Sequence, residues 1–240
     1  MFTEQVMALG ADVELENVIS VESGDVFTVR TEEGSAFEGK SVILAVGVKH
    51  RMLGLPGELD LIGNGISFCA VCDGAFHEGK VVAVLGGGNS ALQEAILLSD
   101  ICKKVYVVQN LDYLTGEKKL QEQLAKKDNV EVITGAKITE LVGESELTAI
   151  KVESANGESE IAVDGLFVAI GLIPQNKQFE NVIALDNWGY ADSDESCVTK
   201  TNGIFVAGDC RKKRIRQVAT AAADGAIAAL AACDYIDNLK

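Results

Sequence analysis

Hydrophobic residues at a helical spacing open the chain and then give way to short β-like runs. Phe2, Val6 and Leu9 fall on one helical face, and Gly10 is placed to end that helix. Three runs rich in β-branched residues follow and predict a small meander that ends in an apolar strand over 42–46. The three runs are 13–22, 26–31 and 41–47.

After a glycine-rich loop at 50–65, which also reads as a domain linker, strands and helices alternate. The run 81–85 is continuously apolar, as expected of a parallel strand that is covered on both faces. An amphipathic helix is predicted over 89–101, with Asn89 or Ser90 as its N-cap. The alternation predicts a doubly wound α/β sheet. Its remaining elements are strands at 105–108 and 130–134 and a helix at 116–128.

A second meander then returns to an apolar strand, so the chain suggests two related halves. The tail adds a strand at 203–209 and a long alanine-rich helix from Gln217 to about Leu239. The runs of the second meander are 137–143, 148–154 and 161–171.

Composition adds size and charge to this picture. With 240 residues and a hydrophobic content of 48%, the chain can bury a sizeable core in one large domain or two modest ones. The net charge of -15 argues against a nucleic-acid partner, whose phosphates need a basic surface. No apolar run reaches the roughly 18 residues of a membrane span, and the first residues lack a signal-peptide pattern. We therefore expect a cytoplasmic protein without a membrane partner.

One short segment departs from the acidic balance. RKKRIR at 211–216 holds five cationic residues in six. It reads either as a solvated loop or as a docking patch for an acidic partner protein or a cofactor phosphate. The residues alone leave both interpretations open.

The turn between the apolar strand and the helix that follows it fits the pattern G-x-G-x-x-A. Gly86 allows a tight turn, Gly88 lets a pyrophosphate approach the backbone, and Ala91 lets helix and strand pack closely. Asn89 and Ser90 begin a helix whose first N–H groups are free to bind phosphate. The pattern predicts a dinucleotide site, and a glycine-rich turn without a ligand is the alternative.

The next strand should supply the group that reads the ribose of a dinucleotide. An acidic residue there accepts from the 2′-OH of NAD, whereas an arginine suits the 2′-phosphate of NADP. The segment offers Gln109 and Asn110 at the strand end and Asp112 a little later, and it contains no arginine. It therefore does not select NADPH, and it permits NADH.

Two cysteines, Cys69 and Cys72, form a C-x-x-C pair ahead of this turn. Such a pair is a redox dithiol, half of a zinc site or two buried thiols. The only histidines are His50 and His77 and no second C-x-x-C exists, so a redox dithiol is favoured over a metal site. Asp73 is placed to exchange a proton with a leaving thiolate. The other cysteines, expected to be reduced and buried, are Cys102, Cys197, Cys210 and Cys233.

Five segments of the chain carry motifs that occur together in one family. They are VILAVG at 42–47, CAVCDG at 69–74, GGGNSA at 86–91, GIFVAGDC at 203–210 and RQVATAAADGA at 216–226. In this combination the chain resembles the bacterial-type, low-molecular-weight thioredoxin reductases, and the resemblance covers essentially all of it. Valine replaces the threonine that this family has in the first of these motifs.

The resemblance implies two Rossmann-like dinucleotide-binding domains, each of three layers. An FAD-type domain would comprise 1–50 and 175–240, and an NAD(P)H-type domain at 51–174 would carry the dithiol. The family's N-terminal strand and its G-x-G-x-x-G turn have no counterpart in this sequence. We therefore expect the FAD-type domain to be incomplete at its N-terminus, and the chain to be a fragment or a truncated reading frame.

The resemblance also implies an FAD site around the end of the chain. Asp209 would bind the ribitol, and the isoalloxazine ring would lie near the start of the last helix. The helix residues concerned are Gln217, Val218 and Ala219, and the remaining residues implied in the site are Gly47, Gly208 and Arg216.

The implied activity passes electrons from a reduced donor through FAD and the dithiol to thioredoxin or a similar disulfide protein, in a homodimer. Cys72 would be the thiol nearest the flavin, Cys69 the thiol that attacks thioredoxin, and Asp73 the general acid. A reductase of another disulfide protein, or an inactive nucleotide-binding fragment, are the alternatives.

The electron donor stays open. The three arginines with which the family binds the NADPH 2′-phosphate align with Gln109 to Thr115 and are all replaced. The donor is then expected to be NADH or, as in some relatives, ferredoxin, for which RKKRIR would serve as the dock.

Overall fold

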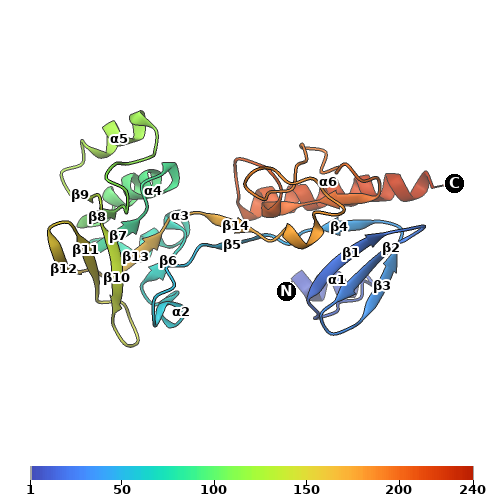
Figure 1. The fold of residues 1–240 in the computed structure, drawn as a ribbon, viewed down its shortest axis with the longest axis horizontal. Coiled ribbons are helices and arrows are strands. Elements are labelled where there is room, and N and C mark those ends of the chain that lie inside the picture. Colours follow the sequence, from blue (N-terminus) through green and yellow to red (C-terminus); the bar gives the residue numbers. More distant parts are fainter. Residues whose placement is uncertain (1, 240) are drawn as a thin grey trace. The chain divides into compact units, whose positions relative to one another are not determined.

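The computed structural model describes residues 2–239 and divides the chain into two compact units. The first unit joins Met1–Lys49 to Ile173–Lys240, and the second is His50–Leu172 (Figure 1). The sequence placed these boundaries after residues 50 and 174. Two short strands, β5 (Val48–His50) and β14 (Leu172–Pro174), pair with each other where the chain passes between the units.

The second unit is built on a five-stranded sheet in the order β6-β13-β7-β8-β9. Every neighbouring pair in it is parallel. The strand–helix alternation predicted this sheet, because parallel neighbours need crossover connections. The strands are β6 (Ile66–Ser67), β7 (Val81–Leu85), β8 (Lys104–Val108), β9 (Val130–Ile133) and β13 (Gly165–Val168).

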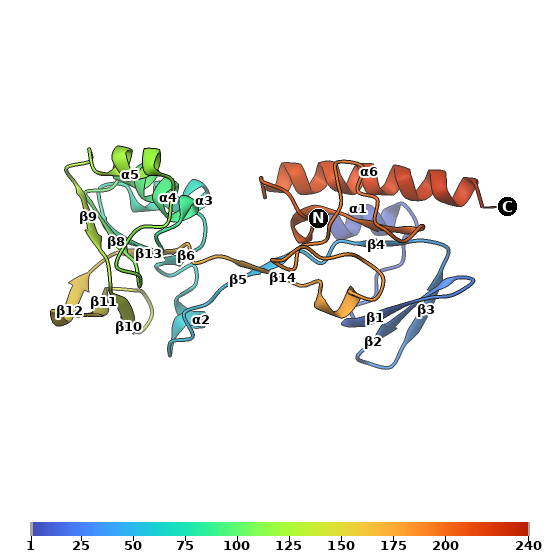
Figure 2. The ribbon, with the colours of Figure 1, turned by 45° about the horizontal axis from the view of Figure 1, so that its top comes forward.

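The two faces of this sheet are covered differently. Val82 and Val84 point into a core shared with α4 (Asn89–Ser99), on the side that also carries α3 (Ala70–Asp73) and α5 (Lys118–Leu124) (Figures 1 and 2). Ala83 and Leu85 point into a second core that contains the antiparallel meander. The expected doubly wound arrangement is thus corrected to helices on one face and β-structure on the other. The meander strands are β10 (Lys137–Val142), β11 (Ala149–Ser154) and β12 (Gly157–Ala162).

The start of α4 differs from the prediction that Asn89 or Ser90 caps it. The N-cap is Gly88, and no side chain caps the helix there. The Asn89 side chain instead holds the loop before α5, because its Oδ1 accepts from the Glu117 N–H at 2.7 Å and its Nδ2 donates to the Glu117 carboxylate at 3.0 Å. The first N–H groups of α4 are therefore left without a side-chain acceptor.

The first unit combines a small meander with a parallel strand pair. The meander is β1 (Val18–Ser23), β2 (Phe27–Thr31) and β3 (Ala36–Gly39), after α1 (Phe2–Ala8). The apolar run at 42–46, predicted as the last meander strand, forms β4 (Val42–Leu44) and pairs parallel with β15 (Ile204–Val206) instead. The remaining short elements are α2 (Glu58–Leu61) and η1 (Gly74–His77) in the second unit, and η2 (Lys177–Phe179) and η3 (Gly208–Cys210) in the first.

The last helix, α6 (Val218–Asp237), packs on this strand pair. By length and composition alone it is apolar enough to cross a membrane, whereas the sequence predicted no membrane span. However, Ala228 and Ala232 are buried with Phe205 of β15, and Asp224 is buried among cations of the same unit. One face of α6 is therefore packed within its unit, while most of its residues are exposed.

Candidate active site

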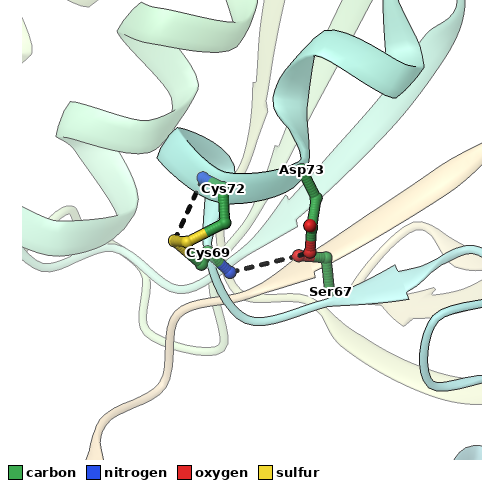
Figure 3. The surroundings of a disulfide bond; sticks show 4 residues. All are labelled: Ser67, Cys69, Cys72 and Asp73. Atoms are coloured by element: carbon green, nitrogen blue, oxygen red, sulfur yellow. Dashed lines mark hydrogen bonds between the residues drawn. A yellow bond between two sulfur atoms is a disulfide. The ribbon is translucent and has the colours of Figure 1, made fainter. Parts of the chain in front are cut away.

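The two cysteines of the C-x-x-C pair are joined by a disulfide at the start of α3 (Figure 3). Cys69 is the N-cap of this helix, and its Sγ accepts from the Cys72 N–H at 3.2 Å. Cys72 is exposed and Cys69 is half-buried. The observed bond agrees with the redox interpretation, and a disulfide in this position is accessible to a macromolecular thiol.

A carboxylate and a hydroxyl adjoin the disulfide. Asp73 follows Cys72 directly, and the Ser67 hydroxyl donates to its Oδ2 at 2.6 Å (Figure 3). The same Ser67 Oγ accepts from the Cys69 N–H at 3.1 Å. Ser67 therefore fixes Asp73 relative to the backbone of the first cysteine.

Ser67 was not among the residues that the sequence singled out. A serine two positions before a cysteine is common in turns, and only its contact with Asp73 gives it a role. The one available signal was a hydroxyl on a short strand, six residues before an acid.

The glycine turn after β7 is shaped as its pattern predicts. Gly86 has a φ of +132°, and a Cβ on it would lie 2.5 Å from the Ala169 carbonyl oxygen, so no other residue fits. Ala91 is fully buried and would lie 3.2 Å from the same Cβ, which explains the small residue there. The space beside Gly88 is open, with Thr115 Oγ1 at 3.7 Å as the nearest atom to an added Cβ.

A cavity of about 670 Å³ opens at this turn. Gln109 and Asn110 from the end of β8 form part of its wall, as does Ser90 at the start of α4. Gln109 is 6% exposed; its Oε1 accepts from the Asn110 N–H at 3.1 Å, and its amide lies against Gly87. Among the described residues, the cations that line the cavity are Arg51 and Lys137, which lie outside the 109–115 segment.

The residues implied in flavin binding gather around η3 and the start of α6. Gly208 has a φ of +79°, and the Oδ1 atom of Asp209 is buried without a hydrogen-bond partner among the described residues. Arg216 stacks on the Tyr190 ring at 4.1 Å and donates to the Asp209 carbonyl oxygen at 3.2 Å. Gln217 is the N-cap of α6.

The other implied residues are open to a ligand. Val218 is 80% exposed and Ala219 is exposed at the first turn of α6. Gly47 has a φ of +63° and no heavy atom within 4 Å of an added Cβ. Gly47 adjoins η3, because its backbone N–H and that of Val46 face the Cys210 thiol. Burial raises the pKa of this thiol, and the two N–H groups partly offset the rise.

The cationic segment 211–216, for which the sequence left a solvated loop and a docking patch open, is only partly exposed. The Arg211 side chain is 2% exposed and binds both carboxylate oxygens of Asp224 at 2.8 Å. The Lys213 side chain is 5% exposed and donates to Asp224 at 2.9 Å. Two of the five cations are therefore internal, because a buried carboxylate on α6 neutralises them.

Comparison with known proteins places the chain in a family. Residues 4–225 match the family model described as pyridine nucleotide-disulphide oxidoreductase. The thioredoxin reductase of Listeria monocytogenes is 38% identical over 234 residues, which are 96% of this chain and 73% of that protein. The thioredoxin reductase of Bacillus subtilis is 35% identical over 99% of this chain and 76% of its own length.

A solved structure agrees with these relatives. The crystal structure of thioredoxin reductase from Streptococcus pyogenes superposes with a TM-score of 0.89 at 35% identity, over 98% of this chain and 78% of that one. The chain thus spans about three quarters of the length of these proteins. With a dinucleotide-type turn and an exposed C-x-x-C disulfide in one unit, this chain is an oxidoreductase of the pyridine nucleotide-disulphide family and belongs to its thioredoxin reductases.

Proposed function

We propose that this chain is a flavin-dependent disulfide reductase that passes electrons through Cys69 and Cys72 to thioredoxin. The observation that carries the proposal is the exposed disulfide at the start of α3 with Asp73 beside it. In this assignment the unit His50–Leu172 is the NAD(P)H-type domain and the other unit is the FAD-type domain.

The residues of the first unit fit FAD. The buried Oδ1 of Asp209 accepts no hydrogen bond among the described residues and has only Lys213 near it, at 3.8 Å, so it could accept from a ribitol hydroxyl. The open space at Gly47 admits a ligand near the backbone. The exposed first turn of α6 offers an apolar face at Val218 and Ala219 for a flat ring. FAD, when bound, supplies the two-electron transfer between a nicotinamide and a disulfide.

The chain's own residues handle the sulfur and proton chemistry. Cys69 would attack the disulfide of thioredoxin, and Cys72 would then attack the mixed disulfide and release reduced thioredoxin. Asp73 would protonate the leaving thiolate from its carboxyl group. Ser67 would hold that carboxyl group in reach by its 2.6 Å hydrogen bond.

The donor we assign is NADH rather than NADPH. The segment Gln109–Thr115 holds no arginine, although it aligns with the three arginines by which the family binds the NADPH 2′-phosphate. A 2′-phosphate would therefore find no bidentate arginine partner in this segment. The cationic segment supports a ferredoxin donor less than its sequence suggests, since two of its five cations, Arg211 and Lys213, are buried.

A homodimer is part of the same proposal. The α6 helix leaves Leu230 69% exposed and Ile227 38% exposed, so an apolar strip remains for a second copy of the chain.

The test is the visible spectrum of the purified chain after FAD addition and desalting, followed by turnover with NADH, NADPH or reduced ferredoxin and thioredoxin. We expect retained flavin, NADH-dependent reduction, and no turnover in Cys72→Ser. Failure to retain flavin would contradict the proposal for these 240 residues, and turnover with ferredoxin alone would overturn the donor assignment.

A further inference from the structure

A second cavity lies beside Asp73, and the two cysteines do not line it. Its volume is about 340 Å³. Asp73 and Ser67 form part of its wall together with His77, Lys80, Glu146 and Asp164. A polar cavity of this size has room for several water molecules.

Asp73 therefore follows the disulfide directly in the chain (Figure 3) and also lines the cavity. A general acid that protonates a thiolate must recover its proton before the next turnover. Asp73 is only half-exposed, and one of its oxygens is held by Ser67. The cavity is consequently the natural route by which Asp73 exchanges protons with solvent.

The imidazole of His77, which lines this cavity, is held firmly. His77 ends η1, and its ring meets the Phe167 ring edge-on at 5.2 Å. It also covers Gly165, where an added Cβ would lie 2.5 Å from Cε1 of the ring. The Nδ1 atom is buried, and no hydrogen-bond partner for it occurs within the part of the chain that the structure describes. A buried ring nitrogen without a partner is rare in a folded protein, so this ring calls for an explanation beyond packing.

Charged groups on several elements face this ring. Lys80 follows η1, Asp164 precedes β13, Glu146 lies between β10 and β11, and Asp73 ends α3. Burial lowers the pKa of His77, Lys80 lowers it further, and Asp164 and Asp73 partly offset these effects. The imidazole is therefore neutral at neutral pH, with one nitrogen able to accept a proton and the other able to donate one.

We propose that His77 is a positioning and proton-relay residue, which returns protons from solvent to Asp73 across the 340 Å³ cavity. The inference rests on the proposed function through the role of Asp73 as general acid. An external thiolate forms a bond to one sulfur of the disulfide, the S–S bond breaks, and the other sulfur takes the proton of Asp73. The Asp73 carboxylate then takes a proton from His77, which takes one from solvent.

The test uses dithiothreitol as the reductant of the Cys69–Cys72 disulfide, so it needs neither flavin nor nucleotide nor thioredoxin. The second thiolate of dithiothreitol attacks the mixed disulfide, which yields the free dithiol and the cyclic disulfide. The rate is followed by acid quenching and alkylation between pH 5.5 and 8.5 and divided by the thiolate fraction of the reductant.

The variants are His77→Ala, His77→Gln, Asp73→Asn and, as the matched control, His50→Ala. His50 is also half-buried and stacks on Phe68 at 4.5 Å, directly before Cys69, but it does not line the cavity. Both His77 variants should slow reduction by about tenfold, less than the direct loss of a general acid. Added imidazole should restore the reduction rate of His77→Ala, because the missing ring leaves a space of that shape. It should not restore the rate of Asp73→Asn. His50→Ala should stay within about twofold of the parent chain.

Each contrary result points to a different failure. Unchanged rates in both His77 variants, or slowed rates that imidazole does not restore, would overturn the relay, because a structural role gives no rescue. An unchanged rate in Asp73→Asn would overturn the relay together with the acid role on which it depends. If the His77 variants and the imidazole rescue behave as expected but the chain does not reduce thioredoxin, the relay is supported and the proposed function is rejected.

Discussion

Two aspartates, Asp73 and Asp224, have opposite surroundings. The carboxylate of Asp224 is 5% exposed and is held by Arg211 at two oxygens and by Lys213 at one. These partners lower its pKa to about 2, with the Arg211 hydrogen bonds as the largest cause. Asp73 is half-exposed and accepts from the neutral hydroxyl of Ser67, and no lysine or arginine in the described chain forms an ion pair with it.

The difference separates a structural carboxylate from a chemical one. Asp224 also accepts from the Gly208 N–H at 3.0 Å, so it joins α6 to the turn that holds Asp209. A carboxylate fixed by two cations stays ionised and gives up no proton. Asp73 has instead one hydroxyl partner and, beside it, a cavity with room for several water molecules.

The same substitution at both sites gives the largest expected contrast. Asp224→Asn removes the charge that neutralises two buried cations and should lower the free energy of unfolding by about 3 kcal/mol or more. Asp73→Asn should lower it by less than about 1 kcal/mol. Urea unfolding followed by circular dichroism measures both, and equal losses would show that the two sites are not different in kind.

A second variant tests whether the stability comes from Asp224 itself or from the other carboxylate that pairs with Arg211. Glu195 also pairs with Arg211, at 3.0 Å, but it is 88% exposed. Glu195→Ala should therefore cost less than about 1 kcal/mol in the same unfolding assay. A larger loss would assign the stability to the outer pair instead.

Acid should expose the same contrast without mutation. The pKa of Asp224 is about 2 in the folded chain against an ordinary value of 3.8. A lowered folded pKa contributes stability that is complete above the unfolded pKa and is lost as pH falls from about 4 towards 2. The contribution is roughly 2 kcal/mol. The free energies of unfolding of the parent chain and of Asp224→Asn should therefore converge as the pH falls from 6 to 2. A constant difference between them across this range would contradict the lowered pKa.

The smallest expected effect concerns the hydroxyl that positions Asp73. Ser67→Ala removes the hydrogen bond to Asp73 and the acceptor of the Cys69 N–H. Reduction of the disulfide by dithiothreitol should slow by about threefold to tenfold, with stability lowered by about 1 kcal/mol. Ser67→Thr, which keeps the hydroxyl, should recover most of the rate. A loss in both variants would indicate crowding at this position rather than a lost hydrogen bond.

Patterns within a few residues were sufficient to predict several elements and motifs of the molecule. Continuous apolar runs placed β7 and β8, because strands buried on both faces carry no polar positions. The interlocking of Gly86 with Ala91 followed from the spacing of small residues. The C-x-x-C spacing marked the dithiol, because two thiols three residues apart meet at the first turn of a helix.

Predictions that depended on distant partners were less accurate. The run at 42–46 was given to the meander, but it pairs with β15, which lies about 160 residues away and is invisible to a local pattern. The cations of 211–216 were interpreted as a solvated loop or a docking patch. Two of them, Arg211 and Lys213, are instead buried against Asp224 of the next helix, which a local pattern does not reveal.

The sequence by itself determined the order of the elements, the dinucleotide-type turn and the presence of a redox dithiol, since each depends on spacings within a few residues. Only the tertiary structure decided which carboxylates are free to react. It joined Ser67 to Asp73, it placed His77 in the wall of the cavity beside them, and it buried Arg211 against Asp224. The physical reason is that burial and charge pairing set the behaviour of an acidic group, and both are properties of the folded surroundings rather than of the residue.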